Sequence, residues 1–133
     1  MLVSALSSPH PRPGESSILN ALFAAGLDQL HLRKPQQEAR ITKNILDGID
    51  PAYHNRIVLH DHFTLLRQYR LKGLHYRRSL LREGWLTEAA RAGFRWKHKV
   101  SWTSATFYSL EQLQEAPKGI DHLWLSPAFT PIS

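Results

Sequence analysis

With 133 residues, of which 42% are hydrophobic and 21% charged, the chain is long enough to bury a core as one globular domain, and this composition argues against disorder. It has no cysteine, which excludes disulfides and thiolate metal sites. A formal net charge of +6 favours an anionic partner, either a nucleic acid or a phosphorylated small molecule. No apolar run is long enough for a membrane span and no signal peptide is evident, so we expect a soluble, cytoplasmic protein with no membrane partner.

The first two elements are predicted to be a strand and a helix. A short apolar strand is expected at residues 2–6, followed by a loop rich in serine and proline. A helix is expected at residues 15–25, with Gly26 placed where a glycine ends a helix. Its apolar face is predicted to consist of Ile18, Leu19, Leu22 and Phe23.

The strand and helix patterns then repeat. Apolar and polar residues alternate at residues 28–33, which is the period of a strand, and Lys34 and Pro35 end the pattern. A helix is predicted from Gln36 until Gly48 breaks it. Its apolar residues recur every four positions, at Ile41, Ile45 and Ile49.

The stretch from residue 56 to residue 78 reads as a complete β–α–β unit. We predict a buried strand at residues 56–60, an amphipathic helix at residues 61–72 and a second strand at residues 73–76. Polar residues follow each strand: His60, Asp61 and His62 after the first, Arg77 and Arg78 after the second. Ligands bind beyond the carboxyl ends of parallel strands, so this pattern predicts an active site there.

The last part of the chain continues the alternation. Residues 77–95 are predicted to hold a loop and a short helix, and a strand is expected at residues 99–104. A further helix at residues 109–116 begins with the capping-box pair Ser109 and Gln112. A sixth strand is expected at residues 122–126.

Glycines that end helices recur at an almost constant interval, at positions 26, 48, 73, 93 and 119. Such a repeat of strand–helix units is typical of the (β/α)₈ barrel, whose eight units take about 200 residues or more. We therefore predict an α/β fold of TIM-barrel type, with six of its eight strands in residues 1–133 as one partial barrel domain. An open doubly wound sheet is the alternative, although no Gly-x-Gly-x-x-Gly turn follows the first strand.

Five segments at the strand ends resemble, in order and spacing, those of the thiamine phosphate synthase and thiazole tautomerase (TenI) family. They are LHLRKP, IVLHDHF, KGLHYRR, YSLEQL and LWLSPAFTPIS, and together they cover nearly the whole chain. The family pattern after the second strand is Gln-x-Arg-x-Lys, the pattern after the third is Asn-Asp, and the fourth strand carries a His. Each motif is short, so the ordered set carries the resemblance.

The resemblance implies a site for phosphorylated substrates. Arg33 matches the family Arg that binds the pyrophosphate of the pyrimidine substrate, His31 stands at the Gln, and Lys34 lies one place before the Lys, where this chain has Pro35. Ser104 matches a pyrophosphate-binding Ser, with Thr106 as its alternative. Further substrate-binding residues are expected at Arg77, Tyr108, Ser126 and Ser133, and Tyr108 falls where tautomerase-like members of the family carry a His proposed to move protons.

The resemblance also implies the catalytic residues His60, Asp61 and His75. Asp61 matches a magnesium-binding Asp, so Mg²⁺ is the implied cofactor, but the second magnesium Asp would fall near Leu80, where no carboxylate occurs. A zinc cluster of His60, Asp61, His62 and His75 is a less favoured interpretation, and His60 and His75 filling the barrel mouth without a ligand is another.

The implied function is thiamine biosynthesis, with the synthase joining pyrimidine and thiazole precursors and releasing pyrophosphate. A thiazole tautomerase and a binding protein without turnover are the alternatives, and in all three cases the partners are phosphorylated pyrimidine or thiazole molecules. The basic stretch RAGFRWKHK resembles a nucleic-acid patch, but no nucleic-acid module accompanies it and we expect no such partner. The four tryptophans, Trp96 among them, are expected to pack in the interior, in the core or between helices and barrel, and not to stack on a ligand. Open strand edges of a partial barrel predict that it self-associates, as a homo-oligomer, or is unstable in isolation.

Overall fold

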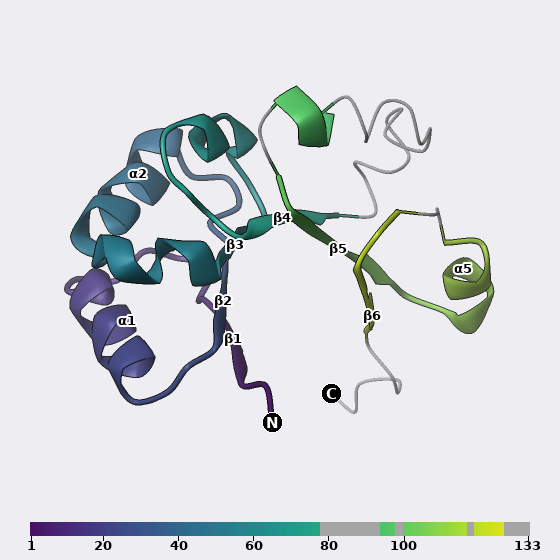
Figure 1. The fold of residues 1–133 in the computed structure, drawn as a ribbon, viewed down its shortest axis with the longest axis horizontal. Helices are drawn as coiled ribbons and strands as arrows, with labels where there is room; N and C mark the ends of the chain where they lie inside the picture. The colour runs from purple at the N-terminus through teal and green to yellow at the C-terminus, as the bar shows by residue number, and fades with distance from the viewer. Residues whose placement is uncertain (78–93, 98–99, 117–118, 127–133) are drawn as a thin grey trace. The chain divides into compact units, whose positions relative to one another are not determined.

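The computed structural model describes residues 1–77, 94–97, 100–116 and 119–126 (Figure 1). Contacts divide the chain into two compact units, Met1–Gly73 and Leu74–Ser133. Most of the predicted helix between residues 77 and 95 falls outside the described residues. Residues 94–97 are described, and they are helical.

The first unit is built on three parallel strands, β1 (Ser4–Leu6), β2 (Gln29–Leu32) and β3 (Ile57–Leu59). The register places Leu6 beside His31 and Leu32 beside Leu59. In β2 the polar Gln29 and His31 alternate with apolar leucines, and both sets are buried. Because successive side chains point to opposite faces of a sheet, one face of β2 is polar and yet enclosed.

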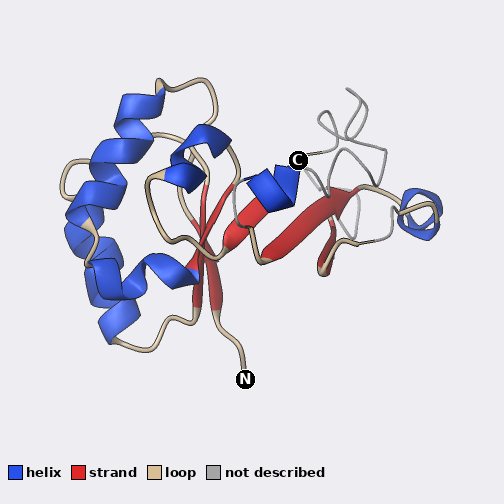
Figure 2. Ribbon diagram, turned by 45° about the horizontal axis from the view of Figure 1, so that its top comes forward, coloured by secondary structure: helices blue, strands red, loops and turns tan. Residues whose placement is uncertain are grey.

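Two α-helices cover one face of these strands, α1 (Glu15–Ala24) and α2 (Ala39–Gly48) (Figures 1 and 2). Leu19 and Phe23 of α1 and Ile45 and Leu46 of α2 are buried. The prediction for the α1 face was half right, because Ile18 and Leu22 are exposed. Gly26 ends the first helix with a φ of 111°, a backbone conformation that favours glycine.

The two helices approach each other closely at Gly48. A Cβ atom there would meet the Ser16 side chain at 2.5 Å, which is too short for any real contact. Ser16 Oγ donates to the Ile45 carbonyl at 2.8 Å, and Asn20 Nδ2 donates to the Gly48 carbonyl at 2.9 Å. Gly48 therefore does more than break the helix, since its lack of a side chain lets α1 and α2 hydrogen-bond directly.

The segment between β3 and β4 differs from its prediction. Instead of an α-helix over residues 61–72, it forms the short 3₁₀ helix η2 (Phe63–Arg67), just as a 3₁₀ helix, η1 (Pro51–Arg56), precedes β3. The adjacent Leu65 and Leu66 are both buried, so the segment is held by neighbouring anchors and not by a helical stripe. Tyr69 supplies a further anchor through its hydroxyl, which donates to Asp47 Oδ1 of α2 at 2.5 Å.

Asp47 also accepts from Lys43 Nζ at 2.7 Å, one turn earlier in α2. The hydrogen bond from Lys43, then the one from Tyr69, lowers the pKa of Asp47, while burial and then the bond to Asp47 raise the pKa of Tyr69. A carboxyl whose folded pKa is depressed stabilises the fold above its unfolded pKa, which is about 4, and loses this effect as the pH falls through the folded value.

We therefore expect Asp47→Asn to lower the free energy of unfolding slightly at pH 7 and to leave it unchanged well below pH 4. Urea denaturation of both proteins across this pH range measures the difference. A difference in the free energy of unfolding that persists unchanged well below pH 4 contradicts this stabilising role, because such a difference would not come from the charge of Asp47.

The second unit contains the parallel pair β5 (Trp102–Phe107) and β6 (His122–Leu125), with the helix α5 (Leu110–Gln114) between them. The strand β4 (Gly73–Tyr76) leads into this unit. Ser109 caps α5 as predicted, accepting from Gln112 N at 3.1 Å. The predicted bounds of β5 lie about three residues too early. The strand begins beside Thr103, whose backbone N–H donates to Asp121 Oδ2.

Within each unit the paired strands run parallel in sequence order, and helices connect them. The chain has an α/β fold of (β/α)₈-barrel type, with six strands among the described residues. None of the described helices is long and apolar enough to cross a membrane.

Candidate functional site

The carboxyl end of β2 is fixed to the end of β1 by one side chain, Ser7. Its Oγ accepts from the backbone N–H of Arg33 at 2.9 Å and donates to the Arg33 carbonyl at 3.1 Å. Ser7 is buried, so water does not compete for either bond. The backbone of Arg33 is therefore held at both of its polar groups.

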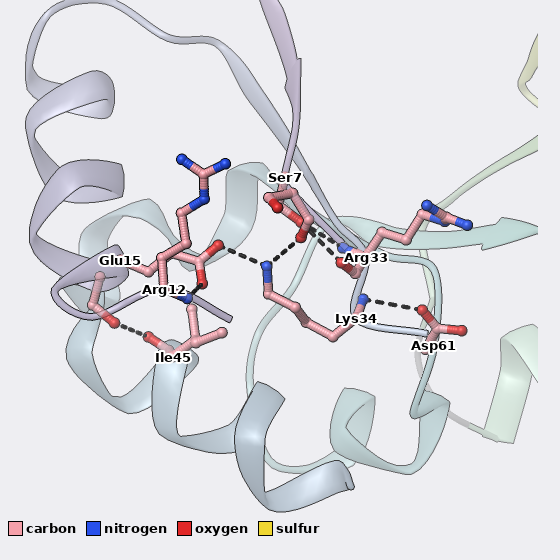
Figure 3. A network of polar contacts seen from close by, with 9 residues as sticks. Ser7, Arg12, Glu15, Arg33, Lys34, Ile45 and Asp61 are labelled. Atoms are coloured by element: carbon pink, nitrogen blue, oxygen red, sulfur yellow. Dashed lines mark hydrogen bonds and ion pairs between the residues drawn. The ribbon is translucent and has the colours of Figure 1, made fainter. Parts of the chain in front are cut away.

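Lys34 turns away from Arg33 into the first unit (Figure 3). Its Nζ forms an ion pair with Glu15 Oε1 at 2.7 Å and donates to the Ser8 carbonyl, and its side chain has no exposed surface. The other carboxylate oxygen of Glu15 accepts from Arg12 N at 3.2 Å. This buried pair ties the loop between β1 and α1 to the end of β2.

The guanidinium of Arg33 is the group that this framework leaves available. It has no hydrogen-bond or ion-pair partner in the part of the chain that the structure describes, and it is half-buried. Figure 3 shows the side chain extending away from the Glu15–Lys34 pair. An unpaired guanidinium on a fixed backbone, with a planar fork of donors, is suited to an oxyanion such as phosphate.

Asp61 follows β3 and reaches the same strand end. Its Oδ2 accepts from the backbone N–H of Lys34 at 3.2 Å. Mg²⁺ prefers several oxygen ligands, whereas the neighbours of Asp61 in sequence are His60 and His62. One carboxylate already accepting a backbone N–H fits magnesium poorly, so no chemical step is assigned to this ion.

The residue after Asp61 has an unusual backbone. His62 has a φ of 57°, in the left-handed region, and its buried Nε2 has no partner among the described residues. Strained backbone of this kind costs roughly 1–3 kcal/mol and clusters at functional sites. It lies directly after Asp61 in the sequence.

His31 and His60 form a buried pair between β2 and the end of β3. His31 Nδ1 lies 2.8 Å from His60 Nε2, and the rings meet edge to face. On its other side, His31 Nε2 lies 2.7 Å from Gln29 Nε2, and Gln29 Oε1 accepts from Lys72 Nζ at 2.6 Å. The four side chains make one continuous hydrogen-bonded chain in the first unit.

In the second unit His75 is buried between two hydroxyls. Its Nδ1 lies 2.6 Å from Ser104 Oγ and its Nε2 lies 2.7 Å from Thr106 Oγ1. The structure thus brings together His75 and both residues considered for the pyrophosphate-binding serine. The ring of Trp124 packs 5.1 Å from that of His75.

The remaining predicted binding residues differ in setting. Arg77, Tyr108 and Ser126 are exposed, and the Ser126 backbone N–H donates to the Phe107 carbonyl at 2.9 Å. Ser133 lies outside the described residues, as does position 80, where the family's second magnesium carboxylate would fall. No role in binding is assigned to these positions by their contacts.

Contacts of Arg95 hold part of the basic stretch near residue 95 in place. Arg95 donates to the carbonyls of Gly119 and Ser101 at 2.9 and 3.3 Å, and its guanidinium lies 3.6 Å from Asp121. The prediction that Trp96 packs in the interior was wrong, because 85% of its surface is exposed. Its neighbour Phe94 lies on the inward side of this short helical turn and is half-buried, which leaves Trp96 outside.

Comparison with solved structures finds a crystal structure of thiamine phosphate pyrophosphorylase from Bacteroides thetaiotaomicron. It matches with a TM-score of 0.77 and 29% sequence identity over 98% of this chain. The chain has a thiamine-phosphate-synthase-like fold. It spans 61% of the length of that protein, and no family model and no curated sequence matches it.

Sequence reasoning missed four residues that contact the candidate residues directly or, for Lys72, through Gln29: Ser7, Glu15, Gln29 and Lys72. Ser7 and Glu15 sit in a loop and a first helical turn, where serine and glutamate are common for local reasons. Gln29 could have been found, because it lies on the same strand face as His31 and a buried glutamine requires a hydrogen-bond partner.

Proposed function

We propose that the chain acts in thiamine biosynthesis as part of a thiamine phosphate synthase, with Arg33 binding the diphosphate of the pyrimidine precursor. The observation that carries this proposal is the fixed backbone and unpartnered guanidinium of Arg33 at the end of β2, among the residues that the structure describes. The similarity to a protein named thiamine phosphate pyrophosphorylase supports it.

The chemistry of the synthase suits such a group. The bond between the pyrimidine methylene carbon and the diphosphate oxygen breaks, pyrophosphate leaves with the electron pair, and the thiazole nitrogen then bonds to the carbon. Negative charge grows on the leaving group, and a guanidinium carried on a firmly held backbone is suited to stabilise it. In this proposal Ser7 and the Glu15–Lys34 pair hold the backbone that carries this guanidinium.

Thiazole tautomerisation is the second candidate, because it needs mainly a residue that moves a proton. His60 and His75 are buried histidines able to take that role. The family position proposed for the base holds Tyr108, which is more than half exposed, so we place this activity second.

The assay incubates the natural full-length protein with both phosphorylated precursors, with and without Mg²⁺. Formation of thiamine phosphate and pyrophosphate is the expected result. Isomerisation of the thiazole carboxylate without condensation supports the tautomerase instead. Saturable binding of either precursor with no product rejects the catalytic part of the proposal and leaves a binding protein.

A further inference from the structure

The hydrogen bonds that link Lys72, Gln29, His31 and His60 must all run the same way, each residue donating to the next. An ammonium has donors and no acceptor, so Gln29 must turn its carbonyl oxygen toward Lys72 Nζ, 2.6 Å away. This fixes the amide, and the NH₂ group of Gln29 then faces His31 Nε2 at 2.7 Å. Since an NH₂ group only donates, His31 Nε2 must accept and carries no proton.

The tautomer of His60 is fixed by its contact with His31. A neutral His31 with a bare Nε2 carries its proton on Nδ1, and this N–H donates to His60 Nε2 at 2.8 Å. His60 Nε2 therefore also accepts, and the proton of a neutral His60 lies on Nδ1. Gln29, His31 and His60 are all at least 95% buried, so water cannot replace a mismatched partner.

We propose that Lys72 and Gln29 are positioning residues that fix the tautomers of His31 and His60, so that His60 offers a proton from Nδ1 and holds no free lone pair on Nε2. This inference deepens the role of His60 in the proposed function, and its direct test does not depend on that function. His60 then serves as a hydrogen-bond donor or acid. It does not serve as a base through Nε2, which counts against it as the base of a tautomerase.

The alternative arrangements each bring two donors together. If His31 carried its proton on Nε2, that N–H would face the NH₂ group of Gln29. If Gln29 turned over, its NH₂ group would face the ammonium of Lys72. A buried donor left unsatisfied is disfavoured by about 1–3 kcal/mol, so the expected tautomer should exceed the other by roughly 5- to 150-fold.

Gln29→Glu is expected to reverse the donor and acceptor roles along this hydrogen-bonded chain, with almost no change in the shape of the side chain. A carboxylate accepts at both oxygens, so the substituted side chain would accept from Lys72 Nζ and from a proton on His31 Nε2. His31 Nδ1 then becomes the acceptor, and His60 donates from Nε2. Gln29→Met removes both polar groups and serves as the control in which the direction is lost but not reversed.

The tautomers are measured by long-range ¹H–¹⁵N NMR of the histidine rings in metal-free, full-length protein, without any ligand. We expect both rings to be protonated on Nδ1 in the wild type and on Nε2 in Gln29→Glu. Lys72→Met, which keeps the length of the stem, should give a mixture in His31. Thermal unfolding verifies that each variant is folded.

A wild-type His31 protonated on Nε2 overturns the proposal, as does an unchanged pair of tautomers in a folded Gln29→Glu variant. If both tautomers are as expected but no precursor binds, the proposed function fails and the fixed histidine pair stands. In the opposite case, binding with the wrong tautomers, the proposed function stands without this inference.

Discussion

Lys34→Met is expected to lower the free energy of unfolding by about 3–5 kcal/mol, the usual cost of leaving one partner of a buried ion pair uncompensated. Lys34 and Glu15 lie 2.7 Å apart, and the Lys34 side chain has no exposed surface. Removing the ammonium leaves the Glu15 carboxylate with the N–H of Arg12 and leaves the Ser8 carbonyl without this donor. Urea denaturation at neutral pH measures the loss.

Two further variants make this test specific. Lys43→Met breaks an exposed ion pair of the same length and should lower the free energy of unfolding far less than Lys34→Met does. The double variant Lys34→Met with Glu15→Gln removes both charges and should recover part of the stability. Should Lys34→Met prove no more destabilising than Lys43→Met, the Glu15–Lys34 pair does not hold the loop after β1.

Arg33→Ala is expected to weaken binding of inorganic pyrophosphate by roughly 10- to 150-fold, because hydrogen bonds to charged groups contribute about 1.5–3 kcal/mol each. The fold should be unaffected, since Ser7 holds the backbone of Arg33 and not its side chain. Calorimetric titration of the folded variant gives the ratio of dissociation constants.

Arg40→Ala is the matched control, since Arg40 is an exposed arginine paired with Glu38 at 2.6 Å and lies in α2. Its removal changes the net charge by the same amount, so any general effect of charge on pyrophosphate binding appears equally in both variants. Arg33→Lys separates charge from geometry, because lysine keeps the charge and loses the fork of donors. Equal losses in Arg33→Ala and Arg40→Ala contradict a specific role for Arg33.

The strand and helix order could be predicted because the hydrophobic periods were clear. β2, α1 and α2 lie within a few residues of their predicted bounds, and Gly26 ends its helix as expected. The segment after β3 could not be predicted, because its conformation depends on distant contacts. Tyr69 is held by Asp47 of another helix, and His62 begins the segment in a left-handed conformation that its residue type does not announce.

The strand-end placement of the candidate residues was predictable, but their contacts were not. Arg33, Asp61 and His60 do follow buried strands, as the sequence indicated. That Lys34 would turn inward to Glu15 could not be read from the sequence, since adjacent cations at a strand end look equivalent there. The chain from Lys72 to His60 joins residues 43 positions apart in its first link, which no local pattern reveals.

The measurement that tests the account most directly is an NMR titration of the wild-type protein with inorganic pyrophosphate, following the arginine Nε–H signals. We predict a saturable shift of the Arg33 side chain, accompanied by the backbone N–H signals of Arg33 and Lys34 at the end of β2. Shifts confined to Arg95 and Lys97, with Arg33 unmoved at saturation, would contradict the assignment of the anion site to the end of β2.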